Sequence, residues 1–292
     1  MIAEDYLDQL VVTIVAEDSV LYESSYWGQH GVSFLLEAYK DNEKRNILID
    51  VAQNPEALLH NMGLLNINPS SIDAIALTHC HYDHTQGIVE IVKAIGKKDL
   101  PVIAHPSLFR LNFIDSPFLR HVGVMNSDSK ERISESGGTL YLTTESLQIM
   151  PGVITTGEVA RQTDFEEVGI PLKTITDDNK IVEDKMKDDL SVIANVKGGI
   201  IILSGCSHAG IVNIVKQSVE ITGVDKIKAV IGGLHLVEAP MERIRKTAKA
   251  LSKFDIDLIS AGHCTGFNAQ VELYNTFKQR FSPLHTGMKF EF

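Results

Sequence analysis

The segment THCHYDHTQG, residues 78–87, places three histidines and one aspartate within six positions, directly after a predicted buried strand. In an extended chain residues two apart face the same way, so His79 and His81 can direct their rings toward one ion. The chain then turns toward a predicted helix, so Asp83 and His84 can face a second ion. Zinc prefers imidazole nitrogens and carboxylate oxygens, and manganese and iron also accept them. The segment therefore predicts a metal site.

Three histidines in the last third of the chain each follow a continuous apolar run, which is typical of a strand buried on both faces. His208 follows GIIILSG, His235 follows KAVIGGL and His263 follows DLISAG. Open α/β sheets bind ligands at the carboxyl ends of their strands, so we expect these three histidines to lie near the 78–87 segment. The histidines without such a placement are expected to be ordinary surface or core residues: His30, His60, His121 and His285.

The rest of the chain alternates short apolar runs with amphipathic segments, the pattern of an α+β protein. The runs LVVTIVAED, VSFLLEAY, NILIDV, SIDAIALTH, PVIAH, TLYLTT, SLQIM, GVITTG and LSVIANV predict strands. The segments PEALLHNMGLL, IVEIVKAIG, GIVNIVKQSVEITG and PMERIRKTAKALSKF predict helices, the second of them closed by Gly96. Because no Pro/Gly-rich linker divides the chain, we expect a single domain over 1–292.

Two stretches depart from this pattern. Residues 106–138 mix aromatic, Ser, Asp and Gly residues over a length uncommon for a connection, which predicts a lid-like insertion. Residues 177–189, DDNKIVEDKMKDD, are strongly charged and predict a solvated loop or hairpin.

Composition narrows the range of functions. The formal net charge of −11 disfavours a nucleic-acid-binding surface, which needs clustered Lys and Arg. The acidic start MIAEDYLDQL does not resemble a secretory signal, and no apolar run is long enough to cross a bilayer. We therefore expect a cytoplasmic protein with a small-molecule substrate and no membrane or nucleic-acid partner. No particular oligomeric state is predicted.

The HxHxDH pattern of residues 79–84 resembles the signature of the metallo-β-lactamase superfamily. The resemblance implies a four-layer αβ/βα sandwich, in which two mixed β-sheets pack face to face and helices cover both outer sides. It also implies one or two metal ions, with zinc expected and Mn²⁺ or Fe²⁺ as alternatives. The six expected ligands are His79, His81, Asp83, His84, His208 and His263.

The resemblance also assigns supporting residues and reveals two departures. Asp50, in LIDVAQ, matches the carboxylate that orients metal ligands from the second shell. Most dinuclear members have a bridging Asp after the strand that matches GIIILSG, but here Cys206 and His208 stand in that region. Members also carry a ligand His earlier in the chain, where this sequence has ITTGE ending at Glu158. Either His208 or Glu158 then completes the first metal site, with His208 favoured and Cys206 as a further ligand.

Within the superfamily the chain resembles the subgroup named for dihydropterin-ribofuranosylaminobenzene phosphate synthase. The likeness rests on the segments QHGVSFLLE, LTHCHYDHTQG, TTGEVAR, LSGCSHAGI, IGGLHL and GHCTG, which occur in this order along most of the chain. Because one fold hosts many reactions, the subgroup name alone does not fix the chemistry.

The leading hypothesis is a metal-dependent hydrolase acting on a small cytosolic substrate of phosphorylated or pterin-like kind. One alternative is a transferase or synthase that condenses a pterin with a phosphoribosyl aminobenzoate, and another is a non-catalytic ligand sensor. In the enzyme, Asp83 would accept a proton and His235 would donate to substrate charge. Arg161 is a candidate phosphate ligand. His105 is a candidate residue of the substrate pocket.

Overall fold

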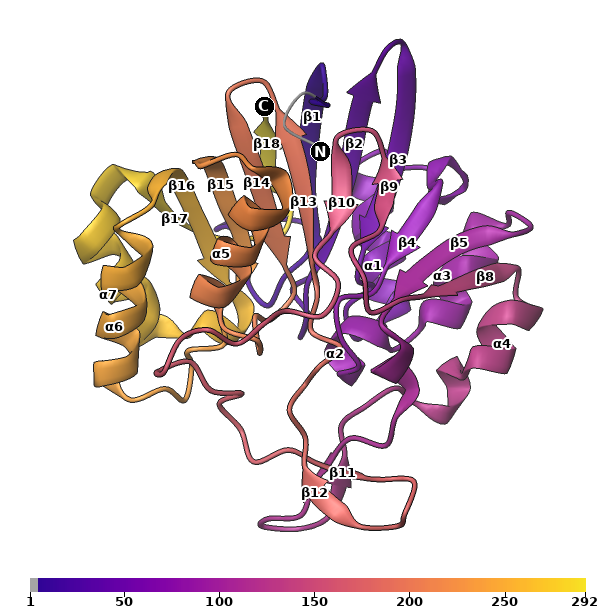
Figure 1. The fold of residues 1–292 in the computed structure, drawn as a ribbon. Helices are drawn as coiled ribbons and strands as arrows, with labels where there is room; N and C mark the ends of the chain where they lie inside the picture. Colours follow the sequence, from indigo (N-terminus) through magenta and orange to yellow (C-terminus); the bar gives the residue numbers. More distant parts are fainter. Residues whose placement is uncertain (1–4) are drawn as a thin grey trace.

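The fold is a sandwich of two mixed β-sheets with helices on both outer faces (Figure 1). The computed structural model describes residues 5–292. The first sheet has the order β18 (Lys289–Glu291), β1 (Gln9–Ala16), β2 (Ser33–Lys40), β3 (Glu43–Ile49), β4 (Ala74–Ala76), β5 (Leu100–Ala104) and β8 (Gly138–Leu142). The second has the order β17 (Phe281–Pro283), β16 (Asp255–Gly262), β15 (Lys226–Gly233), β14 (Gly199–Ser204), β13 (Ser191–Val196), β10 (Val153–Thr155) and β9 (Gln148–Met150). The predicted α+β class and four-layer sandwich are confirmed.

The helices lie outside the sheets, and their ends follow local sequence signals. They are α1 (Pro55–Leu64), α2 (Tyr82–Thr85), α3 (Ile88–Ile95), α4 (Lys130–Glu135), α5 (Ile211–Thr222), α6 (Met241–Leu251) and α7 (Phe267–Phe277). The Asn54 side chain accepts hydrogen bonds from two backbone amides in the first turn of α1. Gly96 ends α3 in the left-handed conformation with φ of 68°, as its position in the sequence predicts. None of the helices in residues 5–292 is long and apolar enough to cross a membrane.

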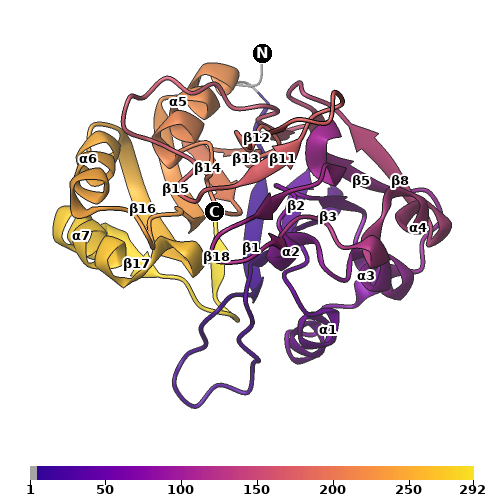
Figure 2. The same cartoon turned by 90° about the horizontal axis from the view of Figure 1, so that it is seen from below.

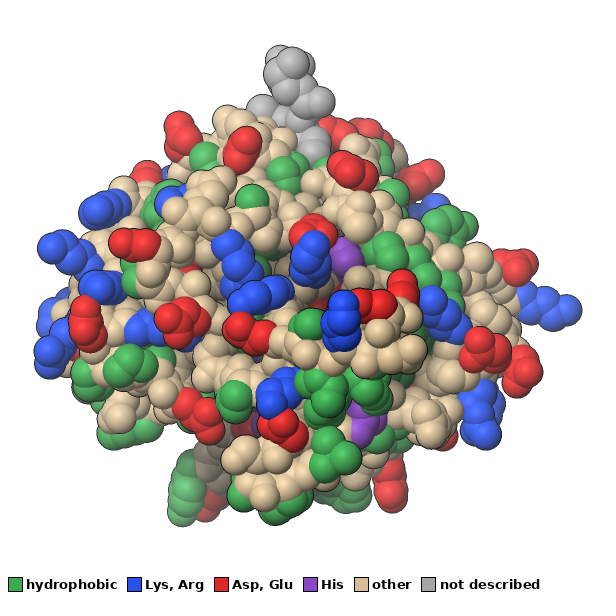
Figure 3. All heavy atoms as spheres, turned by 60° about the horizontal axis from the view of Figure 1, so that its bottom comes forward, with side chains coloured by type: hydrophobic (Ala, Val, Ile, Leu, Met, Phe, Trp, Pro, Cys, Tyr) green, Lys and Arg blue, Asp and Glu red, His purple; other side chains and the backbone are tan. Residues whose placement is uncertain are grey.

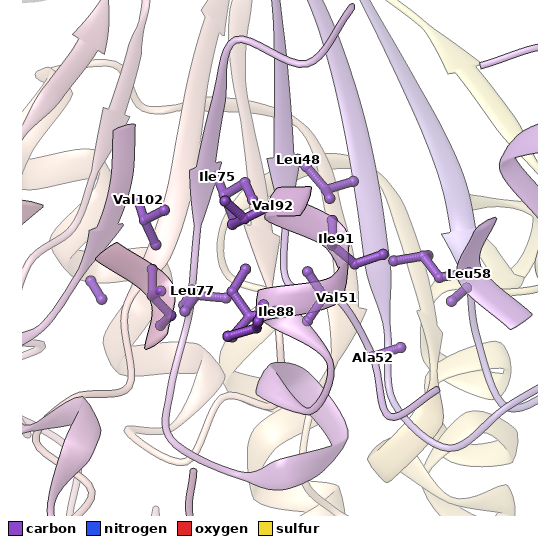
Figure 4. Packing of buried hydrophobic residues seen from close by; sticks show 14 of the residues in the cluster. Leu48, Val51, Ala52, Leu58, Ile75, Leu77, Ile88, Ile91, Val92 and Val102 are labelled. Carbon is purple, nitrogen blue, oxygen red and sulfur yellow. The ribbon is translucent and has the colours of Figure 1, made fainter. Parts of the chain in front are cut away.

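Alternation along the strands divides the buried side chains between layers. In β2, Phe34 and Leu36 point into the central core between the sheets, whereas Leu35 packs into the outer core under α1 and α3. Figure 4 shows this outer core, where α3 lies over residues of β3 and β4 such as Leu48 and Ile75. A third core lies between the second sheet and α5, α6 and α7. Burial on both faces therefore explains why the central strands read as continuous apolar runs.

A small third sheet lies below the sandwich in Figure 1 and is seen again from below in Figure 2. Its order is β12 (Ile181–Glu183), β11 (Lys173–Ile175), β6 (Phe113–Ile114) and β7 (Arg120–His121). Only the first part of the segment 106–138 contributes to it, because the chain then returns through α4 to β8. The β11–β12 hairpin agrees with the prediction for 177–189. The prediction of a fully solvated segment is wrong, because Asp184, Asp188 and Asp189 are buried.

Candidate metal centre

The predicted metal ligands come from loops at the carboxyl ends of strands in both sheets, at the bottom of the sandwich in Figure 1. The run 79–84 leads from the end of β4 into α2 in the first sheet. His208 follows β14 and His263 follows β16 in the second sheet. The face-to-face packing of the two sheets therefore brings the two groups of residues together.

The first donor cluster consists of His79, His81 and His208. The Nε2 atoms of His79 and His208 each lie 3.2 Å from His81 Nδ1, and all three rings are buried. The other ring nitrogens of His79 and His208 face away, toward Thr78 Oγ1 at 3.0 Å and the Val168 carbonyl at 3.2 Å. Burial and neighbouring histidines hold the pKa of His79 and His208 well below the usual value. Neutral imidazoles with converging nitrogens are suited to bind a cation.

The second cluster consists of Asp83, His84 and His263. Asp83 Oδ2 lies 3.5 Å from His84 Nε2 and 3.2 Å from His263 Nε2. Burial lowers the pKa of His84, but the Asp83 and Asp50 carboxylates outweigh it and raise this pKa to about 9. For Asp83, burial raises the pKa, but His84 and His263 outweigh it and hold the value well below normal, so the carboxylate stays ionised. Burial lowers the pKa of His263, but Cys264, Asp18 and Asp83 outweigh it and hold the value well above normal.

The chemistry of the two donor sets fits a divalent metal ion. Three neutral imidazoles suit zinc, and a carboxylate with two imidazoles suits zinc, manganese or iron. His263 Nε2 and Asp83 Oδ2 face each other at 3.2 Å, so a bound cation can replace the proton that holds this pair together.

Asp50 lies where the resemblance places it, behind the ligands. Its Oδ2 atom accepts hydrogen bonds from His84 Nδ1 and from the Thr78 hydroxyl, both at 2.7 Å, and its Oδ1 atom accepts one from the Thr78 amide at 2.7 Å. These bonds direct His84 Nε2 toward the second cluster and fix the start of the 79–84 run. A carboxylate in this position orients a ligand and fixes its tautomer.

Cys206 and His235 lie against the two clusters. The Sγ atom of buried Cys206 lies 3.2 Å from His84 Nε2. The His235 ring lies 4.0 Å from the His208 ring between centroids, and its buried Nδ1 has no partner among the described residues. His235 also lines the cavity described below, which places it beside the candidate metal donors.

Glu158 and His105 lie together, apart from the donor clusters. Glu158 Oε2 is 3.5 Å from His105 Nε2, and Glu158 Oε1 is 3.6 Å from Lys187 Nζ. His105 Nδ1 accepts the Ser107 amide at 3.1 Å, and neither His105 nor Glu158 lines the cavity at the donors. Of the two candidates for the third residue of the first cluster, His208 lies beside His81, whereas Glu158 contacts His105 and Lys187.

Arg161 is engaged with the backbone and does not reach the cavity. Its guanidinium donates to the His208 carbonyl at 2.9 Å and to the Lys185 carbonyl at 2.6 Å. Arg161 lines a neighbouring hollow beside Glu166 and Glu183 instead. Its position therefore holds the His208 loop in place and does not present a cation to a substrate at the donors.

Asp18 and His30 lie at the candidate site, although the sequence around His30 predicts an ordinary surface or core residue. His30 Nε2 lies 3.4 Å from Asp83 Oδ2, and His30 Nδ1 lies 3.0 Å from Asp18 Oδ1. Asp18 Oδ2 also accepts from His263 Nδ1 at 2.5 Å, and so holds two imidazoles at once. Asp18 lies two residues after the end of β1, so the pattern of polar residues after strands could have indicated it.

The side chains of Asp188 and Asp189 bind backbone amides of the two loops that carry the candidate ligands. Asp188 Oδ2 accepts the amide of Cys80, between His79 and His81, at 2.8 Å, and Asp189 Oδ2 accepts the amide of Ala209 at 2.7 Å. Both carboxylates are buried, and Asp188 Oδ1 lies 2.8 Å from Arg110 Nη1. Because residues 177–189 are charged throughout, the sequence does not distinguish Asp188 and Asp189 from exposed neighbours.

We expect Asp188→Asn to weaken metal binding about tenfold. This is the lower end of the loss in metal affinity seen when a residue that orients a metal ligand is replaced. The amide keeps an acceptor but loses the charge that pairs with buried Arg110, so the Cys80 amide is held less firmly. Zinc affinity is measured by competition with a chromophoric chelator. Asp178→Asn, in the same charged segment 177–189 but with a side chain that is 59 % exposed, is the control and should bind as wild type. Equal affinities for both variants would contradict a positioning role for Asp188.

A cavity of about 530 Å³ opens at the metal donors. It is lined by Asp18, His30, His81, Tyr82, Asp83, Ile114, Ser116, Arg120, Val122, Ile170, Pro171, Leu172, Cys206, His235, Val237, Glu238, His263 and Cys264. The roof comes from the small sheet, which contributes Ile114 and Arg120. Among the described lining residues Arg120 is the only Lys or Arg, and the described ion pairs give it no carboxylate partner.

The fold and the site together define a class of protein. A model of the metallo-β-lactamase superfamily matches residues 27–183. A crystal structure of a metal-dependent hydrolase of the β-lactamase superfamily matches with a TM-score of 0.79 at 21 % identity, covering 96 % of this chain and 98 % of that chain. A metallo-β-lactamase fold protein from Bacillus subtilis matches with a TM-score of 0.57 at 12 % identity, covering 98 % and 100 % of the two chains. The chain belongs to the metallo-β-lactamase superfamily.

A particular group of relatives follows from the sequence. The chain is 41 % identical over 291 residues, 98 % of both chains, to 7,8-dihydropterin-6-methyl-4-(β-D-ribofuranosyl)-aminobenzene-5'-phosphate synthase of Methanocaldococcus jannaschii. An uncharacterised protein of the same archaeon is 32 % identical over 259 residues, covering 88 % of this chain and 91 % of its own. The resemblance to the synthase subgroup is confirmed, as is the expectation of an enzyme. The 41 % identical relative is named a synthase, which favours the transferase alternative over the hydrolase hypothesis.

Proposed function

We propose that the chain is a metal-dependent synthase that joins a reduced pterin to an aminobenzene carrying a ribose phosphate. The observation that carries this proposal is the 41 % identity to the archaeal synthase, because it extends over 98 % of both chains. An alignment of that extent includes the loops that form the cavity as well as the ligand motifs. The proposal replaces hydrolysis as the leading hypothesis.

The cavity suits two planar substrates with one anionic end. Ile114, Ile170, Leu172 and Val237 give it apolar walls that can pack against aromatic rings. Arg120 supplies a cation in the roof, and the metal donors form the opposite side. A guanidinium binds phosphate through paired hydrogen bonds, so Arg120 takes the phosphate-binding role that we expected of Arg161.

In the proposed reaction the aromatic amine nitrogen forms a bond to the exocyclic carbon at position 6 of the pterin. A phosphate or diphosphate group leaves that carbon with the bonding electrons, and the amine loses a proton. Metal bound by the two clusters, Zn²⁺ or alternatively Mn²⁺ or Fe²⁺, would supply positive charge that stabilises the leaving group. His235 lines the cavity and can bind a polar substrate group. The ionised Asp83 carboxylate lines the cavity, and its negative charge can stabilise the positive charge that develops on the amine before the proton leaves.

The surface around the cavity supports a small substrate over a long polyanion. Figure 3 shows basic side chains interspersed with acidic ones over this face. The net charge of −11 also disfavours binding of a nucleic acid, because phosphate backbones are bound by clustered Lys and Arg.

The test is a condensation assay on metal-loaded protein. It supplies a reduced pterin with a diphosphorylated hydroxymethyl group, together with a 4-aminobenzene ribofuranosyl phosphate, and measures the joined product by mass spectrometry. We expect the product to form with one diphosphate released per C–N bond. Generic phosphoesters and thioesters serve as hydrolysis substrates in parallel.

Each other outcome rejects the proposal. Turnover of a phosphoester or thioester without any joined product would restore the hydrolase hypothesis. Metal-loaded protein that acts on none of these compounds would favour the sensor.

A further inference from the structure

Cys206 lies between the two donor clusters. Its side chain is buried, and its Sγ atom lies 3.2 Å from His84 Nε2, the nitrogen that His84 turns away from Asp50. The donor atoms of His79, Cys206 and His208 all lie within 4.8 Å of one another. The same holds for the group Asp83, His84, Cys206 and His263. Cys206 is thus the member that these two groups share.

The separations suit coordination of common ions. Zinc binds thiolate sulfur at about 2.3 Å and imidazole nitrogen at about 2.0–2.1 Å, so donors on one tetrahedral ion lie about 3–4 Å apart. The 3.2 Å between Cys206 Sγ and His84 Nε2 falls in this range. The 3.2 Å between Asp83 Oδ2 and His263 Nε2 falls in the same range, so the second cluster also has the spacing of donors to one cation.

The backbone around Cys206 is held firmly. Gly205 comes so close to Thr78 Oγ1 and Asp50 that a side chain on it would collide with both. On the other side, Ser207 has a φ of 64°, and its hydroxyl donates to the Gly233 carbonyl at 2.7 Å. These contacts tie the position of the Cys206 sulfur to β15 and to Asp50, the residue that orients His84.

The other two cysteines do not share this placement. Cys80 is buried behind the 79–84 run and belongs to none of the donor groups among the described residues. Cys264 groups only with Cys206 and His235, and its Sγ atom accepts the His235 amide at 3.3 Å.

We propose that Cys206 is a thiolate ligand shared by the two metal positions, in the place where most dinuclear relatives have a bridging carboxylate. A thiolate favours zinc, cobalt or iron over manganese, because soft sulfur binds borderline metals better than hard ones. The sulfur then neutralises charge between two cations held by His79, His81 and His208 on one side and by Asp83, His84 and His263 on the other. The proposal concerns the metal centre alone and does not depend on the substrate.

The experiment titrates reduced, metal-free protein with Co²⁺ and follows the thiolate-to-cobalt charge-transfer band in the near ultraviolet. A shared thiolate predicts that the band grows with both the first and the second equivalent. Growth over one equivalent only would place the sulfur on a single ion and overturn sharing, and absence of the band at two bound ions would overturn ligation altogether.

Variants identify the sulfur responsible. Cys206→Ser should lose the band and bind the second ion about 100-fold more weakly. This matches the largest loss in affinity seen when a residue that only orients a ligand is replaced, and a direct ligand should contribute at least as much. Cys206→Asp should recover two ions without the band, which separates loss of the ligand from loss of folding. Cys264→Ser, the matched control, should keep the band. A band that persists in Cys206→Ser or disappears in Cys264→Ser would refute the assignment.

These spectra need no substrate. A failed condensation assay with an intact band would reject the proposed function and leave the shared thiolate standing. Condensation by a protein without the band would support the proposed function and reject the shared thiolate.

Discussion

Replacing His208 with alanine is expected to lower turnover about 1,000-fold and to reduce the metal content, whereas Glu158→Gln should retain both. His208 Nε2 lies 3.2 Å from His81 Nδ1, so its loss leaves the first cluster with two imidazoles. A metal ion contributes several kcal/mol to stabilising charge in a transition state, and about 1.4 kcal/mol corresponds to tenfold in rate. Elemental analysis and turnover of the condensation substrates measure the two effects.

Glu158→Gln is a matched control, because the sequence leaves Glu158 as the alternative ligand. In the structure Glu158 is exposed and contacts His105 and Lys187, away from the donors. Circular dichroism of both variants checks that the fold is intact. Loss of metal in Glu158→Gln with full occupancy in His208→Ala would reverse our assignment.

Replacing Arg120 with alanine is expected to raise KM for the phosphorylated aminobenzene substrate about 10- to 100-fold with little change in kcat. A hydrogen bond to a charged group contributes about 1.5–3 kcal/mol to binding. Because Arg120 is exposed to solvent, we expect its contribution to lie near the lower value. Such binding is the same in the ground state and the transition state, so it affects KM and leaves kcat unchanged. Steady-state kinetics with the phosphorylated and dephosphorylated substrates measure the difference.

Arg120→Lys should recover only part of the affinity, because an ammonium cannot pair with two phosphate oxygens as a guanidinium does. Arg132→Ala, an exposed residue of α4 away from the cavity, is the control. If Arg120→Ala leaves the preference for the phosphorylated substrate unchanged, the phosphate is bound elsewhere.

The sequence predicted the central layers and the proposed donors because both depend on short-range patterns. A strand buried on both faces must be apolar along its length, so the runs before His208, His235 and His263 indicated strands and their ends. The spacing of the 79–84 run indicated a metal site because alternate residues of an extended chain face one side.

The supporting residues were harder to find because their partners lie far away in the sequence. Asp188 lies in a charged run, and charged residues are usually exposed, so a solvated segment was expected. Its burial depends on Arg110 and on the Cys80 amide, which only the packed structure brings to it. His30 follows no strand, and its approach to Asp83 depends on how the loop after β1 folds back.

By itself the sequence determined the class of fold and the superfamily, and it predicted a set of metal donors, because backbone periodicity and ligand chemistry are local properties. The tertiary structure placed His208 at the first cluster and Glu158 away from it, left Arg161 outside the cavity and placed Arg120 there. It also placed Cys206 between the two clusters. These outcomes depend on which loops meet when two sheets pack face to face, and distances across that junction are not encoded in the spacing of residues along the chain.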